Sequence, residues 1–223
     1  MTTWEQLRDA IRTELKDTND EPAYKWSDEL LYLYLKDALA DYSLYLPLQT
    51  DRTELTLSEG KYSLPTDFVD VLFVECGDNR FLEERRPRPG RKFPSYAGRP
   101  FFYYISGGSL YLIGSPLESD KVYLTYRAAH SAPDDEYDDT HVFTIPANDE
   151  ELIRLYVRAK CYEQTRSRQS NLDRFKERHQ SGSSRQDNPL TPEVENLMEE
   201  YYRKLQERVG GGSITLSRSG RTR

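Results

Sequence analysis

The chain has 223 residues, of which 36% are hydrophobic and 31% are charged, and its formal net charge is −7. This length suits one large domain or two small ones, with a core that needs no disulfide or metal ion to hold it. No segment approaches the roughly 20 apolar residues of a membrane span, and the start of the chain lacks the basic and apolar regions of a signal peptide. We therefore expect a reducing cytoplasm, with Cys76 and Cys161 as buried thiols and a disulfide as the alternative.

Charge is distributed unevenly along the chain. Residues 210–223 contain Arg218, Arg221 and Arg223 and no acidic residue, so these three positive charges leave −10 on the remainder. An acidic body repels phosphate groups, which argues against DNA binding through the main surface. The 17 tyrosines suit positions where a ring packs and its hydroxyl meets a polar group, as at interfaces.

A first amphipathic helix is predicted over about 3–16. Thr2 and Glu5 have the spacing of a capping box, and Trp4, Leu7 and Ile11 follow at helical intervals.

A second helix is predicted to begin after Ser27, a good N-cap, and to end at Pro47. Its apolar stripe is widened by Leu30, Leu33 and Tyr45. Because a helix that is apolar on more than one side must be covered twice, we expect a second cover from the β insertion or from a neighbouring subunit.

From residue 54 the apolar period changes to two, which is typical of strands. A proline turn at Pro65 launches the longest of them, and Gly107-Gly108 lies between two β-prone runs, a strong hairpin signal. Strands are predicted at residues 55–57, 62–64, 69–76, 80–84, 101–105, 110–113 and 121–127. They predict a compact antiparallel sandwich or small barrel.

Two more helices are predicted after residue 147. Asn148 and Glu151 have the capping-box spacing, and a helix that begins there is followed by a Ser/Gly-rich linker over 180–188. Thr191-Pro192-Glu193 then starts the most regular amphipathic helix of the chain, which Gly210 ends.

The sequence therefore predicts an α+β protein, a bundle of about four helices with an inserted β domain and an extended C-terminal arm. We expect residues 1–50 and 147–209 to form the helical domain and residues 51–146 the β domain. Residues 210–223 would be a flexible tail, in which Ile214-Thr215-Leu216 has strand character and is suited to order on a partner.

Two segments of the predicted β domain carry opposite charge. Residues 80–92 contain six basic and two acidic residues, whereas residues 133–140 carry five acids and no base. We interpret both as contact segments between subunits. The basic residues of this proposal are Arg85, Arg86, Arg88, Arg91 and Lys92, and the acidic ones are Asp134, Asp135, Glu136, Asp138 and Asp139.

Each charged segment has other interpretations. The arginines lie near Phe93, Tyr96, Phe101 and Phe102, so phosphate contacts and base stacking are an alternative to a subunit contact. The acidic segment lacks the ligand spacing and glycine of an EF-hand. A solvated loop, or an acidic wall facing DNA, are its other interpretations.

The sequence offers no catalytic pattern. His130, His141 and His179 lack the spacing of metal ligands and have no cysteine nearby in the sequence. We expect solvated histidines, no catalytic residues, no metal and no cofactor.

Several stretches together resemble a known family. They are the Ser27-Asp28-Glu29-Leu30-Leu31 helix start, the run Tyr62-Ser63-Leu64-Pro65-Thr66-Asp67-Phe68-Val69-Asp70-Val71, the Tyr103–Leu112 hairpin and Val122–Tyr126. In this order they resemble the head-to-tail adaptor, or connector, proteins of tailed bacteriophages, closest to members similar to tail tubular protein A with a β insertion.

The resemblance implies a structural protein in the neck of the virion, made in the host cytoplasm, which forms a ring, usually twelvefold, below the portal. It implies a portal partner above, the next tail or neck protein below, passage of double-stranded DNA during genome ejection, and no membrane. By position, the last helix and the tail would dock on the portal. The residues concerned are Val194, Leu197, Met198, Tyr201, Leu205, Ile214, Leu216, Arg218, Arg221 and Arg223.

An alternative from a different class of function is a monomeric module that holds nucleic acid or glycan on the Tyr/Arg-rich β domain.

Overall fold

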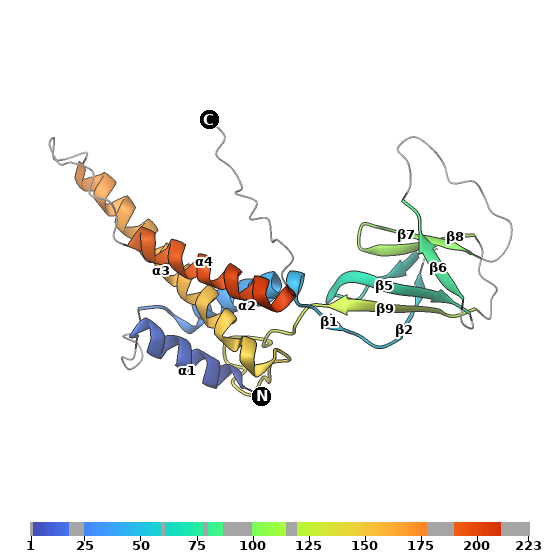
Figure 1. Ribbon diagram of the computed structural model, residues 1–223, viewed down its shortest axis with the longest axis horizontal. Helices are drawn as coiled ribbons and strands as arrows, with labels where there is room; N and C mark the ends of the chain where they lie inside the picture. Colours follow the sequence, from blue (N-terminus) through green and yellow to red (C-terminus); the bar gives the residue numbers. More distant parts are fainter. Residues whose placement is uncertain are drawn as a thin grey trace. The chain divides into compact units, whose positions relative to one another are not determined.

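The computed structural model describes residues 2–17, 25–58, 61–77, 80–86, 100–114, 120–177 and 190–210. The chain divides into two compact units (Figure 1). Residues 1–46 and 130–223 make up the helical unit, and residues 47–129 make up the β unit. The described residues confirm a mixed α+β fold with four α-helices.

Helix α1 (Trp4–Leu15) and helix α2 (Asp28–Tyr45) begin at well-formed caps. In α1 the capping box is made by Thr3 and Gln6, so the predicted pair Thr2 and Glu5 was wrong by one residue. Thr3 has the extended backbone that a cap requires, and it also bridges to Val142, which fixes the position of the helix start. In α2 the predicted N-cap Ser27 is confirmed, since its side chain accepts from the Leu30 N–H.

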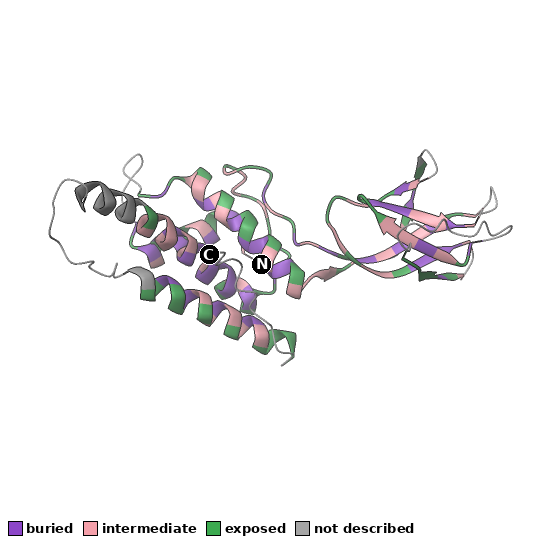
Figure 2. Ribbon diagram, turned by 90° about the horizontal axis from the view of Figure 1, so that it is seen from above, coloured by how far each residue is buried: buried purple, intermediate pink, exposed green. Residues whose placement is uncertain are grey.

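Helix α3 (Glu150–Glu177) follows the 3-10 helix η1 (Ala147–Asp149), and helix α4 spans Leu190–Val209. Helices α1, α2 and α4 all pack against α3, and buried residues gather where the helices face one another (Figure 2). The predicted cap Asn148 was wrong, because Asn148 is an exposed residue inside η1.

The core of the helical unit combines aliphatic and aromatic side chains. Ile153, Val157 and Cys161 of α3 are fully buried at its centre. Trp26 packs edge-on against Tyr162, with ring centroids 6.5 Å apart, and burial raises the pKa of the Cys161 thiol to about 12. The buried core therefore occupies several sides of α3.

Several buried polar groups of this core bond to one another. The hydroxyl of Tyr201 in α4 donates to Asp41 Oδ2 of α2 at 2.7 Å. Burial and this bond both raise the pKa of Tyr201, because both disfavour the phenolate. The Tyr42 hydroxyl donates to Asp149 Oδ2 at 2.8 Å, and Arg208 Nε lies 2.7 Å from Asp149 Oδ1. These bonds join α2, η1 and the last turn of α4.

The β unit is one curled sheet with strand order β1-β9-β5-β6-β7-β8-β4-β3, and β2 also pairs with β9. Its strands are β1 (Leu48–Gln49), β2 (Thr53–Leu55), β3 (Leu57–Ser58), β4 (Lys61–Ser63), β5 (Phe68–Cys76), β6 (Phe81–Glu84), β7 (Phe102–Ser106), β8 (Ser109–Ile113) and β9 (Val122–Ala128).

The curl follows from the chain path at Thr56. Strand β2 pairs with β9 near one end of the strand order, and strand β3 pairs with β4 at the other end. Since Thr56 alone separates β2 from β3, the two edges of the sheet must lie close together. The structure thus confirms a β unit with a curled sheet, but it does not confirm the predicted sandwich or small barrel.

Two further features refine the strand predictions. Gly107 and Gly108 form a two-residue turn between β7 and β8, with φ of 57° and 71°, as expected from the sequence. Strands β6 and β7 pair in parallel, whereas the other pairs are antiparallel, so the antiparallel prediction fails at this junction. A parallel pair needs a long connection, and residues 85–101 supply it.

The chain passes between the units after Leu46 and after Ala129. The sequence placed these crossings at 50/51 and 146/147, whereas in the structure residues 130–146 pack with the helices. The acidic segment 133–140 therefore belongs to the helical unit.

Candidate interaction surfaces

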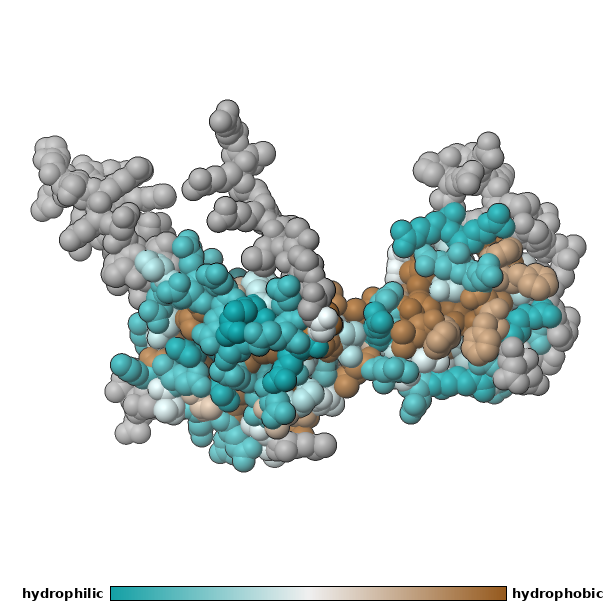
Figure 3. All heavy atoms as spheres, viewed as in Figure 1, coloured by the Kyte–Doolittle hydropathy of each residue, from teal (hydrophilic) through white to brown (hydrophobic). Residues whose placement is uncertain are grey.

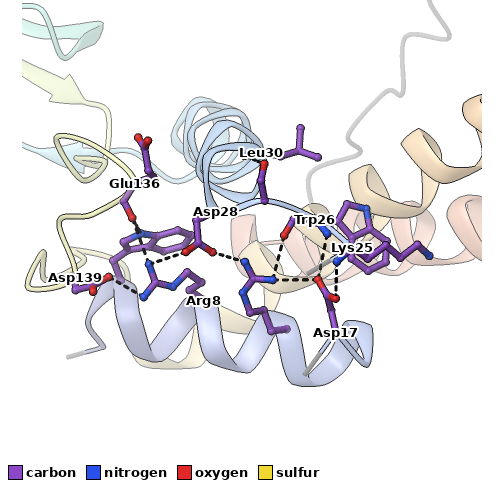
Figure 4. A network of polar contacts seen from close by, with 11 residues as sticks. Arg8, Asp17, Lys25, Trp26, Asp28, Leu30, Glu136 and Asp139 are labelled. Carbon is purple, nitrogen blue, oxygen red and sulfur yellow. Dashed lines mark hydrogen bonds and ion pairs between the residues drawn. The ribbon is translucent and has the colours of Figure 1, made fainter. Parts of the chain in front are cut away.

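The acidic segment 133–140 is a turn fixed against α1 and α2. Trp4 Nε1 donates to the carbonyl oxygen of Glu136 at 3.1 Å, and Arg8 Nη1 donates to the same oxygen at 3.3 Å. Arg8 Nη2 also lies 2.9 Å from Asp139 Oδ1 (Figure 4). From α2, the Tyr32 hydroxyl donates to the Pro133 carbonyl at 3.0 Å. The turn therefore has a defined backbone.

The acidic side chains of this turn serve two purposes. Asp135 Oδ1 accepts from the Tyr137 N–H at 2.9 Å, and Asp138 Oδ1 accepts from the Thr140 hydroxyl at 3.2 Å, so both stabilise the turn itself. The Glu136 carboxylate points away from Arg8 (Figure 4). Tyr137, 76% exposed, is the most exposed of the large apolar side chains among the described residues. The turn thus presents an acidic surface with an aromatic tip.

A buried charge network lies next to the turn and holds the start of α2. Arg12 is 5% exposed and Asp17 is 2% exposed. Arg12 Nη1 lies 3.0 Å from Asp17 Oδ2 and donates to the Trp26 carbonyl at 3.1 Å, while its Nη2 bonds to Asp28. The donors of Arg12 thus bond to a carbonyl and two carboxylates of the same chain. We therefore assign this arginine a structural role and not a role in binding a ligand.

The basic segment is described only at its start. Arg85 lies over the Phe102 ring at 4.8 Å, and Arg86 forms an exposed ion pair with Glu84 at 3.0 Å. The remaining basic residues of the prediction, Arg88, Arg91 and Lys92, lie outside the described residues. The geometry therefore shows two arginines beside the parallel strand junction.

The predicted docking residues of α4 face the helical unit's own core. Val194 and Leu197 are buried, Tyr201 and Leu205 are fully buried, and Met198 packs against the core half-buried. The apolar side of α4 is therefore occupied within the chain. The predicted tail residues Ile214, Leu216, Arg218, Arg221 and Arg223 lie outside the described residues.

Sequence reasoning missed an aromatic pair on the outer side of the β sheet. Phe73 of β5 is 55% exposed and Phe81 of β6 is 64% exposed, and their rings meet edge to face at 5.9 Å. Figure 3 shows hydrophobic atoms gathered over β5 and β6. We call Phe73 and Phe81 the outer aromatic pair.

Two ion pairs involve acidic residues of β5, the strand that carries Phe73. Arg52 makes two hydrogen bonds to Glu75, at 2.9 and 2.8 Å, and lies over the Tyr123 ring at 3.5 Å. Arg127 lies 3.5 Å from Asp70. Exposed aromatic rings inside a polar rim are typical of protein interfaces. In β6, Leu82 is buried and its neighbour Phe81 is exposed. This in-and-out alternation of a strand is the sequence signal that could have shown that Phe81 faces outward.

The two histidines that the structure describes, His130 and His141, each contact other residues of the helical unit. His130 is buried; its Nε2 donates to the Leu46 carbonyl at 3.0 Å, and Thr144 Oγ1 lies 2.9 Å from its Nδ1. Burial lowers the pKa of His130, and the bond to Leu46 opposes this only in part. The prediction of a solvated histidine was wrong here. His141 packs edge-on against Phe143, and His179 lies outside the described residues.

Within the described ranges, no group of three or more His, Cys, Asp or Glu residues is placed to hold a metal ion. Cys76 and Cys161 are both buried and neither forms a disulfide, so the predicted buried thiols are confirmed and the disulfide alternative is not. No described helix is both long and apolar enough to cross a membrane.

Comparison with known proteins decides the family. The sequence profile described as SU10 adaptor protein matches residues 2–193. The chain belongs to the SU10 adaptor protein family. The predicted resemblance to bacteriophage adaptor proteins is thereby confirmed at the level of a phage adaptor with a structural role. None of the curated proteins matches the chain.

The match to the SU10 adaptor family covers α1, α2, the β unit and α3, and it ends within the first turn of α4. An adaptor of this kind interacts with portal and tail components of the virion. Most of α4 and the whole tail lie beyond the match. Their role therefore has to be inferred from their own residues and not from the family.

Proposed function

We propose that this adaptor is a ring-forming head-tail connector of a tailed bacteriophage, twelvefold as the resemblance implies. It would sit in the virion neck between the portal and the next tail or neck protein, and pass the genome to the tail. The observation that carries the proposal is the family match over residues 2–193. The similarity to tail tubular protein A belongs to this proposal as well.

Docking on the portal is assigned to α4 and the tail. Leu197, Met198, Tyr201 and Leu205 pack in the core and Val194 is buried as well, so the helical unit holds α4 in place. This helix would therefore carry the tail to the portal. Residues 210–223 then supply Ile214 and Leu216 for strand-like or apolar contacts and three arginines for acidic groups of the portal.

Ring closure is assigned to the charged segments. The acidic turn has a fixed backbone and an exposed Tyr137, and Arg85 and Arg86 lie in the β unit. A contact between the acidic turn of one copy and the basic segment of the next uses two different patches, which is the arrangement that closes a ring. Acidic side chains that face the channel would repel DNA phosphates and let the genome slide.

The tail-side contact is assigned to the outer aromatic pair. Phe73 and Phe81 offer apolar area that the β unit does not cover itself, and the resemblance implies that the β part faces the next tail or neck protein. Aromatic side chains at the centre of a polar rim contribute most of the binding energy at many interfaces.

The proposal is tested by capture on the portal protein of the same phage. Full-length adaptor should form a complex whose mass matches a ring on the portal, and a truncated chain of residues 1–210 should bind more weakly while it stays folded. Replacing Arg218, Arg221 and Arg223 by Gln should weaken capture, more so at low salt than at high, because salt already screens the contacts of the unaltered tail. Arg203→Gln is the matched control, because Arg203 is an exposed arginine of α4 paired with Glu207. Unchanged capture by the 1–210 chain would remove the tail from the proposal.

The alternative, a monomeric module for nucleic acid or glycan, is separated by salt dependence. Strong DNA binding by the isolated adaptor that falls steeply with salt would favour this alternative. In the β unit, Arg52 and Arg85 already lie over Tyr123 and Phe102, and Tyr104 stacks on Tyr111 at 4.8 Å. These rings thus have partners within the chain.

A further inference from the structure

One side of α2 remains uncovered in the structure. Leu33 is 52% exposed and Leu44 is 67% exposed, and Asp37 and Ala40 between them are exposed as well. Their spacing of four, three and four residues places all of them on the same side of the helix. We call these four residues the α2 outer face. The sequence predicts a second cover for this helix, and the outer face lacks one within the described residues.

A shallow hollow of about 510 Å³ lies at the N-terminal end of the α2 outer face. Leu30 and Leu33 supply its apolar wall, and Glu29 and Glu136 supply acidic groups. Tyr32 also lines it and is held in place by its bond to the Pro133 carbonyl. The hollow is therefore suited to a chain segment that is apolar and basic.

Residues 211–223 of the same chain have this composition. They contain Ile214 and Leu216, whose spacing places both side chains on one side of an extended segment. Three arginines follow at 218, 221 and 223, and no acidic residue interrupts them. The order along the tail is thus apolar first and basic second.

The geometry of α4 allows the tail to reach this face. Arg208 in the last turn of α4 bonds to Asp149, which in turn accepts from Tyr42 in the C-terminal half of α2. A helix of 18 residues is about 27 Å long, whereas 13 extended residues span about 43 Å. A tail that leaves α4 beside Tyr42 can therefore run along α2 from its C-terminal end to its N-terminal end.

In that direction the two sequences match in order. In the tail, Ile214 and Leu216 precede the arginines, and on the face Leu44, its most exposed leucine, comes before Asp37 and Glu29. Leu44 and Glu29 are 15 residues apart, about 22 Å along the helix, and Leu216 and Arg223 are seven residues apart, about 23 Å when extended. An extended tail laid along the face in this register would bring the arginines opposite Asp37, Glu29 and Glu136.

We propose that, before portal binding, the tail of each adaptor lies along its own α2 outer face, with Leu216 at Leu44 and the arginines at Asp37 and at the acidic hollow. The inference rests on the proposed function in one respect, since the portal would compete with α2 for the same tail. The tail is then held until the portal displaces it, which reduces binding to other acidic surfaces.

The test uses a photo-crosslinker in the full-length adaptor without portal. Leu216 is replaced by p-benzoylphenylalanine, and the dilute protein is irradiated and analysed by mass spectrometry. The expected product is a crosslink within one chain to residues 37–44, with a yield that does not change on further dilution. Adding portal protein should lower this yield.

Two variants and a matched control sharpen the test. Leu44→Glu and Asp37→Lys should each lower the crosslink yield about fivefold, because each removes one exposed apolar or ionic contact. Leu57→Glu changes a similarly exposed leucine of the β unit and should leave the yield unchanged. Circular dichroism shows whether the variants keep their helices, and an unfolded variant is replaced by Leu44→Ser or Asp37→Asn.

Three outcomes would overturn the inference. Crosslinks that form between chains and vanish on dilution would assign the α2 outer face to a neighbour's tail. Crosslinks elsewhere, or none at residues 33–44, would remove the tail from this face. Equal yields for Leu44→Glu and the unaltered chain would do the same. Because portal is absent from the main measurement, failed portal capture would count against the proposed function alone.

Discussion

The two units of this adaptor differ in where their charged and aromatic side chains lie. The helical unit buries charged residues, and Arg12, Asp17 and Asp149 lie in its interior with partners of their own. The β unit leaves large aromatic side chains exposed, with Phe73 and Phe81 on its outer side, and keeps most of its ion pairs at the surface. Changes at the buried charges of the helical unit should therefore affect folding, and changes at the outer aromatic pair of the β unit should affect binding.

The largest expected effect is on the buried charge network. Arg12→Ala leaves Asp17 buried without its guanidinium, so the free energy of unfolding should fall by about 3–5 kcal/mol. Urea unfolding at pH 7 followed by circular dichroism measures it. Arg127→Ala is the control from the β unit; its half-exposed pair with Asp70 should cost under about 1 kcal/mol. Equal costs for the two variants would contradict the contrast between the units.

The next largest effect is a difference in stability between the losses of two tyrosine–aspartate hydrogen bonds. Tyr201→Phe removes the bond to the half-buried Asp41 and should cost about 1–2 kcal/mol. Tyr126→Phe removes a comparable bond to Asp67, 3.0 Å long, but Asp67 is exposed and water replaces the hydroxyl. Its cost in the same urea experiment should therefore be smaller. The reverse order would show that burial does not set these costs.

A third effect depends on pH and tests His130. Its pKa is lowered in the folded state, so the unfolded chain binds a proton first as the pH falls below about 6.5. Stability from this group is complete above that value and is lost toward lower pH, by at most about 1.4 kcal/mol per pH unit. Unfolding titrations at several pH values should show a shallower acid slope for His130→Gln. His141→Gln leaves His130 in place, and a slope that changed equally in both variants would refute the assignment.

The smallest folding effect is expected in the β unit. Phe81→Ser should change the free energy of unfolding by less than about 1 kcal/mol, because the ring is mostly exposed. The same variant should lose much of its binding to the next tail or neck protein, measured by calorimetry. Leu57→Ser, at another exposed apolar residue of the unit, is the control and should bind normally. A folding cost of several kcal/mol for Phe81→Ser would show that this surface is part of the core.

Local patterns made the helices and the glycine hairpin predictable. Ser27 and the glycine pair specify a helix start and a primed turn from a few neighbouring residues. The cap of α1 was missed by one position because two threonines are adjacent, and the bridge from Thr3 to the distant Val142 selects between them. Local signals do not contain such long-range contacts.

The surfaces were harder to predict for the same reason. The run 68–76 is apolar at most positions, so it gave no alternation to reveal that Phe73 faces outward. The acidic segment has the composition of a solvated loop, and its fixed backbone depends on Trp4 and Arg8, far away in the sequence. For α4, the docking residues were carried over by position from the resemblance, and only the structure shows that the helical unit packs this side of the helix in its own core.

The link through Thr56 has a consequence for assembly. A sheet with free edges can accept a strand from a neighbour and grow into strand-swapped dimers or filaments. Here each edge strand is only two or three residues long, and the chain connects the two edges directly. In the ring proposed above, neighbouring adaptors would therefore meet through side chains and turns and not through sheet edges.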